Sequence, residues 1–146
     1  MLVPHIMSEK PINEYLAHLL VQANRQVNRQ LSLAGITLEH WRALKSISQN
    51  NGQTMRELAE NLTQNFPTLT KIIDKMVSEA LVYRLPDKQD RRKVRLFISD
   101  NGKAVLAKQN SRVDHHQGKL EDAYGSAEAQ RLKEMLEQFL KSVPHD

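Results

Sequence analysis

Apolar residues recur at helical spacing in the first part of the chain. From Ile12 to about Leu33 they occupy positions 12, 15, 16, 19, 20, 23, 27 and 31, which lie along one face of a long helix. Pro11 suits the first turn of this helix, and Gly35 ends it. The apolar stripe is longer than a small core requires, so part of it is expected to face another chain.

A cap and a breaker delimit a second helix. Thr37 precedes this helix as a cap, and Asn50-Asn51-Gly52 stops it. Trp41, Leu44 and Ile47 share its inner face. Trp41 is the only tryptophan of the chain, and its size predicts an anchor of the core rather than a ligand platform.

Two short helices follow in close succession. Thr54 and Glu57 match the capping box that begins a helix, and this third helix ends near Leu62. After a link of a few residues Asn65 is a plausible cap, and Pro67 fits the first turn of a fourth helix. The expected buried face of the fourth helix consists of Leu69, Ile72, Ile73, Met76 and Ala80. Two short helices joined in this way predict a helix-turn-helix unit.

The segment 82–98 reads as a β-hairpin, because two short apolar runs flank a polar, proline-containing turn. In its second run Val94, Leu96 and Ile98 alternate with polar or aromatic residues, so one face is expected to pack against the core and the other to face solvent. After the hairpin, apolar residues again recur at helical spacing. Ser99 or Asp100 caps a helix that runs to about Ala123, and the last helix begins at Ser126 and ends at Pro144. The apolar stripe of this last helix is Leu132, Met135, Leu136, Phe139 and Leu140. The chain is therefore expected to be mainly α with one small β-hairpin.

Charge is concentrated in the hairpin. Residues 84–95 hold six basic and two acidic side chains, a local net charge of +4 that equals the net charge of the whole chain. A neutral body with one cationic hairpin is the electrostatic footprint of a protein that binds a polyanion. The alternative is that the basic side chains only solvate the edge of the hairpin and oppose aggregation.

Composition narrows the class of protein. A length of 146 residues suits one domain, or one domain with a dimerisation extension. The absence of cysteine excludes disulfides, thiolate zinc sites and cysteine-based redox switches. No apolar run is long enough for a membrane span and no signal peptide is evident, so a cytoplasmic protein without membrane partners is expected. Residues 1–6 fit no element, and Met7 is a candidate native start.

Metal and catalytic chemistry find little support in the sequence. His115 and His116 are adjacent, so on a helix they point about 100° apart and do not easily share one ion. Further ligands would have to converge from elsewhere, and the candidates are Asp114, Glu121, Glu39, His40 and His18. Nucleophile, zinc-hydrolase, phosphate-loop and dinucleotide motifs are all missing. The sequence therefore predicts no metal, no cofactor and no enzyme activity.

Several segments carry a resemblance to a known family. They are Leu38-x-x-x-Trp41-Arg42-x-Leu44, Thr54-x-x-Glu57-Leu58-Ala59, Pro67-Thr68-x-Thr70-Lys71, Leu81-Val82-x-Arg84, Pro86-Asp87-x-x-Asp90-Arg91-Arg92-Lys93 and Ser99-Asp100-Asn101-Gly102. The chain resembles the multiple-antibiotic-resistance regulator (MarR) family of winged helix-turn-helix transcriptional regulators. It departs from the usual pattern at Phe66, where the family more often has a small or polar residue, and at Ile98-Ser99-Asp100.

The resemblance implies a fold and a function. Residues 1–146 would form a single MarR-type domain, with a winged helix-turn-helix DNA-binding region at about 37–102 and dimerisation helices at about 8–34 and 103–143. The protein would be a ligand-responsive repressor that acts as a homodimer on a palindromic operator in double-stranded DNA. The alternative is a winged helix that binds another protein or RNA instead.

The resemblance also assigns DNA contacts. In the fourth helix, which would enter the major groove, the candidates are Gln64, Asn65, Thr68, Thr70, Lys71 and Lys75. In the wing they are Lys88, Asp90, Arg91, Arg92, Lys93 and Arg95. Arg91 is the expected minor-groove residue and Arg92 the backbone contact, with Asp90 orienting one of them; the reverse order of the two arginines stays open.

An effector site is the last expectation. Family members commonly bind small aromatic or phenolic acids between the dimer helices and the DNA-binding region. The side chains that would meet such a ligand are Arg25, Arg29, His40, Trp41 and Arg42. Surface ion pairing and core packing are equally good explanations for these residues.

Overall fold

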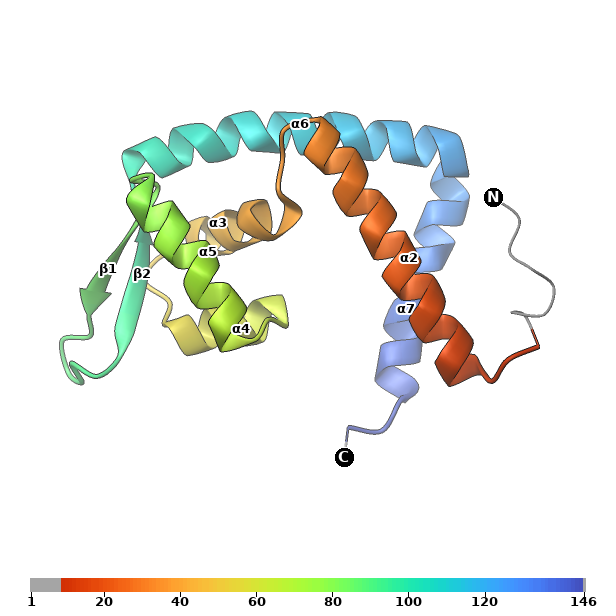
Figure 1. Cartoon of the computed structure of the whole chain (residues 1–146), viewed down its shortest axis with the longest axis horizontal. Helices are drawn as coiled ribbons and strands as arrows, with labels where there is room; N and C mark the ends of the chain where they lie inside the picture. The colour runs from red at the N-terminus through yellow and green to blue at the C-terminus, as the bar shows by residue number, and fades with distance from the viewer. Residues whose placement is uncertain (1–8, 146) are drawn as a thin grey trace. The chain divides into compact units, whose positions relative to one another are not determined.

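A computed structural model describes residues 9–145, which form two compact units divided after Gln109. The first unit contains four helices, a β-hairpin and the start of a further helix (Figure 1). In chain order they are α2 (Ile12–Leu33), α3 (Leu38–Gln49), α4 (Met55–Leu62), α5 (Phe66–Ser78), the hairpin of β1 (Val82–Pro86) and β2 (Val94–Ile98), and α6 (Asp100–Tyr124). The second unit holds the rest of α6 and α7 (Ser126–Ser142). The predicted mainly α fold with one small hairpin is confirmed.

Local capping rules account for the starts of α4 and α5. The Thr54 hydroxyl accepts a hydrogen bond from the Glu57 amide at 3.1 Å, and the Glu57 carboxylate accepts one from the Thr54 amide at 3.3 Å. Asn65 Oδ1 accepts from the Thr68 amide at 2.9 Å. These bonds satisfy amides that the first helical turns leave unpaired. The predicted capping box and the Asn65 cap are confirmed.

Three boundary details differ from the expectation. Pro11 is the N-cap residue of α2 rather than part of its first turn, and the Thr37 side chain makes no cap hydrogen bond at the start of α3. Ala80 is exposed and lies beyond α5 with φ +59°. There the Leu81 amide donates to the Met76 carbonyl at 2.9 Å. This Schellman-type ending turns the chain so that Leu81, not Ala80, enters the core.

The core of the first unit joins three helices to the hairpin. Its completely buried side chains include Ile47 of α3, Leu58 of α4, Leu69 and Ile73 of α5, and Leu96 of β2. The expected inward face of the hairpin is thus confirmed. Trp41 packs against the edge of this core while remaining half-buried.

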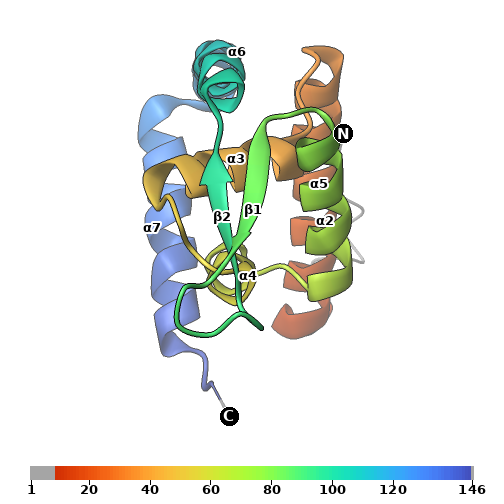
Figure 2. The same cartoon turned by 90° about the vertical axis from the view of Figure 1, so that its left-hand side faces the viewer.

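The loop between α3 and α4 pairs with the hairpin and fixes it against the helices. The Gly52 amide donates to the Leu96 carbonyl, and the Leu96 amide donates to the Gln53 carbonyl, both at 2.8 Å. The buried Gln53 amide group is itself bonded to the Ser46 carbonyl at 2.8 Å and to Asn61 at 3.2 Å. Viewed from the hairpin side in Figure 2, β2 runs beside α3 and α4, and β1 beside α5.

The start of α6 settles the alternative between two caps. The Ser99 hydroxyl accepts from the Gly102 amide at 2.9 Å and also reaches the carbonyls of Ala80 and Leu81. Ser99 is therefore the cap, and Asp100 is the first helical residue.

Large apolar side chains remain exposed on both terminal helices. On α2, Ile12, Leu20 and Val21 are exposed, and on α7 so are Leu132, Met135 and Leu140. None of the helices formed by residues 9–145 is both long and apolar enough to span a membrane.

Candidate nucleic-acid interface

The helix-turn-helix presents a polar outer surface on α5. Thr70, Lys71 and Lys75 are exposed there, whereas Thr68 and the preceding Gln64 are half-buried. Opposite them, the apolar face of the helix is buried in the core. The predicted major-groove residues therefore lie together at the start and along the outer side of one helix.

Asn65 has a structural task in addition to any DNA contact. Its side-chain oxygen is used to cap α5, where it accepts from the Thr68 amide. Within residues 9–145 its side-chain amide nitrogen makes no hydrogen bond. This nitrogen, a donor, can approach a phosphate or a base edge without loss of the cap.

Asp87 organises the loop of the hairpin. Its buried carboxylate accepts hydrogen bonds from the backbone amides of Asp90 at 3.0 Å and Gln89 at 2.8 Å, and from Arg95 Nε. The bond from the Asp90 amide, then that from the Arg95 side chain, and then that from the Gln89 amide stabilise the charged form and lower the pKa of Asp87 to about 2. The loop is thus shaped around an ionised aspartate.

Arg95 ties this loop to the rest of the unit. While Nε bonds to Asp87, one terminal guanidinium nitrogen donates to the Gly52 carbonyl at 2.8 Å. The sequence analysis assigned Arg95 only to DNA phosphate. The structure gives it a second, structural role, because Nε and one terminal nitrogen already donate to protein groups.

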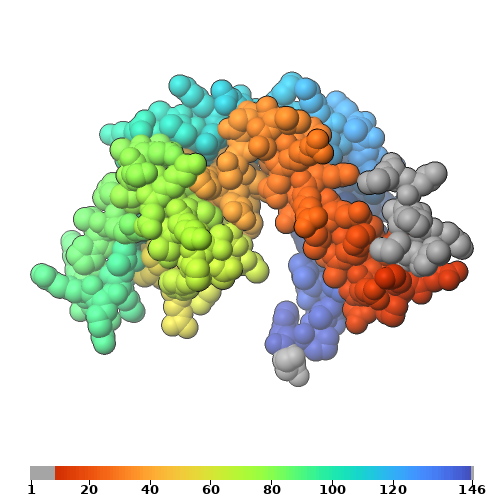
Figure 3. Space-filling model, in the orientation of Figure 1, coloured from red at the N-terminus to blue at the C-terminus, as the bar shows by residue number. Residues whose placement is uncertain are grey.

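Asp90 selects one of the two neighbouring arginines. The Arg92 Nε and backbone amide both donate to Asp90 Oδ1 at 3.1 Å, and the bond from the Arg92 side chain is the main cause that lowers the pKa of Asp90. The Arg92 side chain is nevertheless 92% exposed. Arg91 forms no hydrogen bond or ion pair with any residue between 9 and 145. Lys88, Lys93 and these arginines are all exposed. The loop that holds them, between β1 and β2, projects at the edge of the unit (Figure 3).

A groove of about 810 Å³ separates the hairpin from the helix-turn-helix. Arg84 and Arg92 border it from the hairpin, and Phe66 and Thr70 border it from α5. Across this region Arg84 donates to Asp74 of α5 in an ion pair. The cationic hairpin and the polar side of α5 therefore border the same groove.

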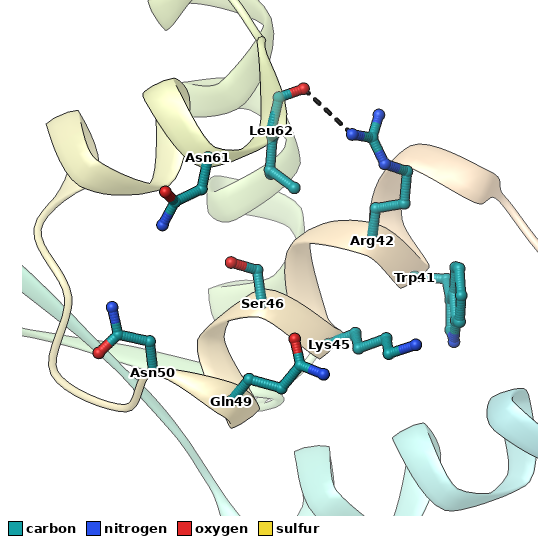
Figure 4. A pocket seen from close by; sticks show the side chains of 8 residues that line it. All are labelled: Trp41, Arg42, Lys45, Ser46, Gln49, Asn50, Asn61 and Leu62. Carbon is teal, nitrogen blue, oxygen red and sulfur yellow. Dashed lines mark hydrogen bonds between the residues drawn. The ribbon is translucent and has the colours of Figure 1, made fainter. Parts of the chain in front are cut away.

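Two of the five predicted effector residues line a common cleft. Trp41 and Arg42 line an open cleft of about 470 Å³ between α3 and α4, together with Lys45, Asn61 and Leu62 (Figure 4). Arg42 donates to the Leu62 carbonyl at 3.2 Å, and the Lys45 ammonium lies 4.8 Å from the centroid of the Trp41 ring.

The other three effector residues lie outside this cleft. Arg25 and Arg29 are exposed on α2, and His40 lies on α3 without lining the cleft. Burial is the main cause that lowers the pKa of His40, followed by the charge of Lys75. Of the five residues, only Trp41 and Arg42 line this cleft, so the grouping of all five in one effector pocket stays a prediction.

Metal ligands do not converge in the part of the chain that the structure describes. No group of three or more His, Asp or Glu side chains there is placed to hold an ion. His115 is exposed and the adjacent His116 is half-buried on α6.

Sequence reasoning missed several residues that shape the interface. Arg84 was counted only as a charge, whereas it pairs with Asp74; Lys45 was not considered as a lining residue of the cleft. The side chain of Asn51 accepts from the Ile98 amide at 2.9 Å and adds to the docking of the hairpin. A charge count gives no partner, and only the fold brings these groups together.

Comparison with known proteins connects this geometry to a family. The sequence model of the MarR family matches residues 36–94, the segment that forms the helix-turn-helix and most of the hairpin. The crystal structure of a mutant of the Escherichia coli MarR protein in complex with operator DNA is 26% identical, has a TM-score of 0.75 and covers 94% of this chain and 99% of its own. Over this segment the chain is similar to the MarR family. It is a winged helix-turn-helix protein of the DNA-binding, transcription-regulating class, and the predicted resemblance is confirmed.

Two relatives of this chain are transcriptional regulators by name. The HTH-type transcriptional regulator FarR of Neisseria gonorrhoeae is 27% identical over 126 residues, 84% of this chain and 86% of the relative. The homoprotocatechuate degradative operon repressor of Escherichia coli is 24% identical over 105 residues, 72% of this chain and 71% of the relative.

Proposed function

We propose that the chain is a ligand-responsive repressor that binds a palindromic operator as a homodimer. The observation that carries this proposal is a cationic, aspartate-braced hairpin loop that shares a groove with the exposed start of α5. One of its relatives is named a repressor, and a structural neighbour is complexed with operator DNA.

In this proposal α5 enters the major groove. The start of a recognition helix contacts base edges, and hydroxyl, amide and ammonium groups suit those edges and the flanking phosphates. Gln64, Asn65, Thr68 and Thr70 are the proposed base-edge contacts. Lys71 and Lys75, further along the exposed side, are the proposed phosphate contacts.

The wing would place an arginine in the minor groove, where a narrow A·T-rich groove concentrates negative potential. The pair between Asp90 and Arg92 favours Arg92 for this role, the reverse of the order first expected from the motif. A guanidinium held in one orientation loses less side-chain entropy when it enters the groove. Arg91, Lys88 and Lys93 then serve as backbone contacts.

Dimerisation would bury the exposed apolar stripes of the terminal helices, in the ranges 8–34 and 103–143, and leave 37–102 to bind DNA. A stripe such as Leu132, Met135 and Leu140 is better covered than left in water. The α5 helices of the two subunits would then lie roughly 34–36 Å apart, which is one turn of DNA. Light scattering at micromolar concentration should give the mass of a dimer, and a monomeric mass would exclude this part of the proposal.

A small aromatic or phenolic acid is the proposed effector. The support is the cleft that combines the Trp41 ring with the cations Arg42 and Lys45, and the name of the relative that represses homoprotocatechuate degradation. Since Arg42 bonds to the last carbonyl of α4, a ligand at Arg42 would act next to the turn that leads into α5.

Fluorescence anisotropy tests the DNA-binding proposal. The duplex is the intergenic DNA upstream of the protein's own gene, with a scrambled duplex of equal composition as the reference, in a salt series. Wild type should bind its own duplex more tightly, with an affinity that falls steeply with salt because phosphate contacts release counterions.

Arg91→Ala, Arg92→Ala and the matched control Lys108→Ala, an exposed cation outside the hairpin and the helix-turn-helix, are compared on both duplexes. Arg92→Ala should remove most of the preference for the specific duplex, Arg91→Ala should weaken binding to both duplexes alike, and Lys108→Ala should change little. Equal, weak binding of wild type to both duplexes would refute operator recognition on this DNA.

A further inference from the structure

Phe66 is an apolar side chain at a position where the core does not need one. It is the first residue of α5 and is 49% exposed. The buried face of the helix is already complete with Leu69, Ile72, Ile73 and Met76. A solitary exposed aromatic residue is ordinary on a protein surface, so its location has to decide whether it has a function.

The location is the groove between the wing and the helix-turn-helix. Phe66 borders this groove together with Thr70, which lies one turn further along the same side of α5, and with Arg84 and Arg92 of the hairpin. In the proposed function this side of the molecule faces DNA. Phe66 is the one large apolar side chain of α5 that is exposed there.

The backbone on both sides of Phe66 is held in place. Asn65 caps the helix through its bond to the Thr68 amide, and the ring of Pro67 fixes φ at the next residue. Phe66 then has only two side-chain torsions to order when it meets a partner, so its contact costs little conformational entropy.

We infer that Phe66 is a specificity-determining residue that contacts the C5-methyl group of a thymine in the major groove. The thymine methyl is the apolar group that the bases present in that groove, where the other features are hydrogen-bond donors and acceptors. Neighbouring Thr70 and Gln64 can read donors and acceptors, but an aromatic ring cannot. The inference rests on the proposed function, because it requires α5 to lie in the major groove.

Deoxyuridine scanning tests the inference directly. A duplex that wild type binds specifically is taken from the upstream DNA or selected from a random pool, and each thymine is replaced singly by deoxyuridine, which lacks only the methyl group. At one thymine in each half-site, replacement by deoxyuridine should weaken binding of the wild-type protein about four-fold. This is the factor expected for the loss of one buried methyl group. Phe66→Ala should bind the thymine and deoxyuridine duplexes equally at that position.

Two further variants separate a methyl contact from a damaged fold. Phe66→Leu keeps an apolar group and should retain part of the sensitivity to the methyl. Leu85→Ala removes an exposed apolar residue of β1 that does not line the groove, and should retain all of it. Circular dichroism melts establish that the variants compared are folded.

The outcomes distinguish the two proposals. If wild type binds its duplex specifically but every deoxyuridine substitution is silent, or if Phe66→Ala keeps the same sensitivity, the Phe66 inference is overturned and operator binding stands. If no duplex is bound specifically, operator recognition itself fails and the inference falls with it.

Discussion

Arg84 of β1 forms an ion pair with Asp74 of α5, and so joins the wing to the helix proposed to read bases. The side chains are 34% and 59% exposed, so the pair is expected to contribute at most about 1 kcal/mol to folding. The pair nevertheless links two elements that are proposed to contact the same duplex.

Asp74→Asn separates positioning from net charge. Removal of a carboxylate near DNA should strengthen binding if only charge matters. If the pair positions α5 against the wing, affinity for the specific duplex should instead fall by about three- to ten-fold. Anisotropy titrations of Asp74→Asn, Arg84→Met and the double variant give the coupling between the two positions. Tighter binding by Asp74→Asn would show that the pair has no positioning role.

Asp90→Ala should weaken DNA binding in the same way as Arg92→Ala, but by a smaller factor. Without the carboxylate that holds its Nε, Arg92 keeps its charge but loses its fixed orientation. Affinity for an A·T-rich operator should fall less than in Arg92→Ala, although the net positive charge rises by one. The measurement is anisotropy on duplexes whose central A·T pairs are kept or replaced by G·C. An unchanged preference for A·T pairs in Asp90→Ala would mean that the pair with Arg92 does not prepare minor-groove binding.

The low pKa of Asp87 predicts how the stability of the fold depends on acidity. The pKa is lowered from 3.8 to about 2 in the folded chain, so the folded state favours the ionised carboxylate. The contribution to stability is therefore fully present above pH 3.8 and is lost as the pH falls toward 2. Urea unfolding from pH 7 to pH 2 should show Asp87→Asn less stable than wild type at neutral pH, with the difference shrinking below pH 4.

An exposed aspartate provides the control for this pH dependence. Asp114 is exposed on α6 and is not among the hydrogen-bonded carboxylates of the described residues, so Asp114→Asn should match wild type at neutral pH. A difference between Asp87→Asn and wild type that persists unchanged to pH 2 would show that lost packing, and not the charged carboxylate, causes the instability.

The sequence predicted the elements best where a short motif decides the outcome. The reciprocal bonds of Thr54 and Glu57, and the cap at Asn65, follow from rules that span three residues. The choice between Ser99 and Asp100 remained open because either side chain can cap a helix. It is decided by the Ala80 and Leu81 carbonyls, which the fold brings to the Ser99 hydroxyl.

Long-range contacts explain the parts of the site that the sequence did not predict. Arg95 bonds to the carbonyl of Gly52, 43 residues away, and no local pattern indicates that partner. The effector residues are a similar case: Trp41 and Arg42 line a cleft between α3 and α4, whereas Arg25 and Arg29 are exposed on α2. A common role of these residues in effector binding stays a prediction. Residue type indicates a possible chemistry, but the packing of helices decides which groups share a cleft.

Gly102 should tolerate no side chain. A Cβ atom there would lie 2.1 Å from the Leu81 carbonyl oxygen and 2.8 Å from Ile98 Cγ1, so α6 and the hairpin would have to move apart. Gly102→Ala is expected to lower the free energy of unfolding by about 2 kcal/mol or more, measured in urea.

Gly118 is the matched control on the same helix. A Cβ atom there meets nothing within 4 Å, so Gly118→Ala should raise the free energy of unfolding by about 0.5–1 kcal/mol through helix propensity alone. Equal effects of the two substitutions would contradict the close approach of α6 to Leu81.

The cleft beside Trp41 offers a direct optical test of effector binding. Trp41 is the only tryptophan of the chain, so a change in intrinsic fluorescence reports on this site. Saturable quenching by 2-hydroxybenzoate is expected, with benzyl alcohol as the control that lacks a carboxylate. Arg42→Met should weaken binding of the acid by about ten-fold or more, because a hydrogen bond to a charged group contributes about 1.5–3 kcal/mol.

Coupling to DNA completes this prediction. The acid is proposed to release the protein from its operator through the bond between Arg42 and the Leu62 carbonyl. Coupling of this kind is reciprocal: operator DNA must weaken binding of the acid by the same factor by which the acid weakens DNA binding. Titrations of the acid with and without the specific duplex measure that factor, and in Arg42→Met it should approach one. Quenching that is unchanged in Arg42→Met, or equal for the acid and the alcohol, would place the effector elsewhere in the molecule.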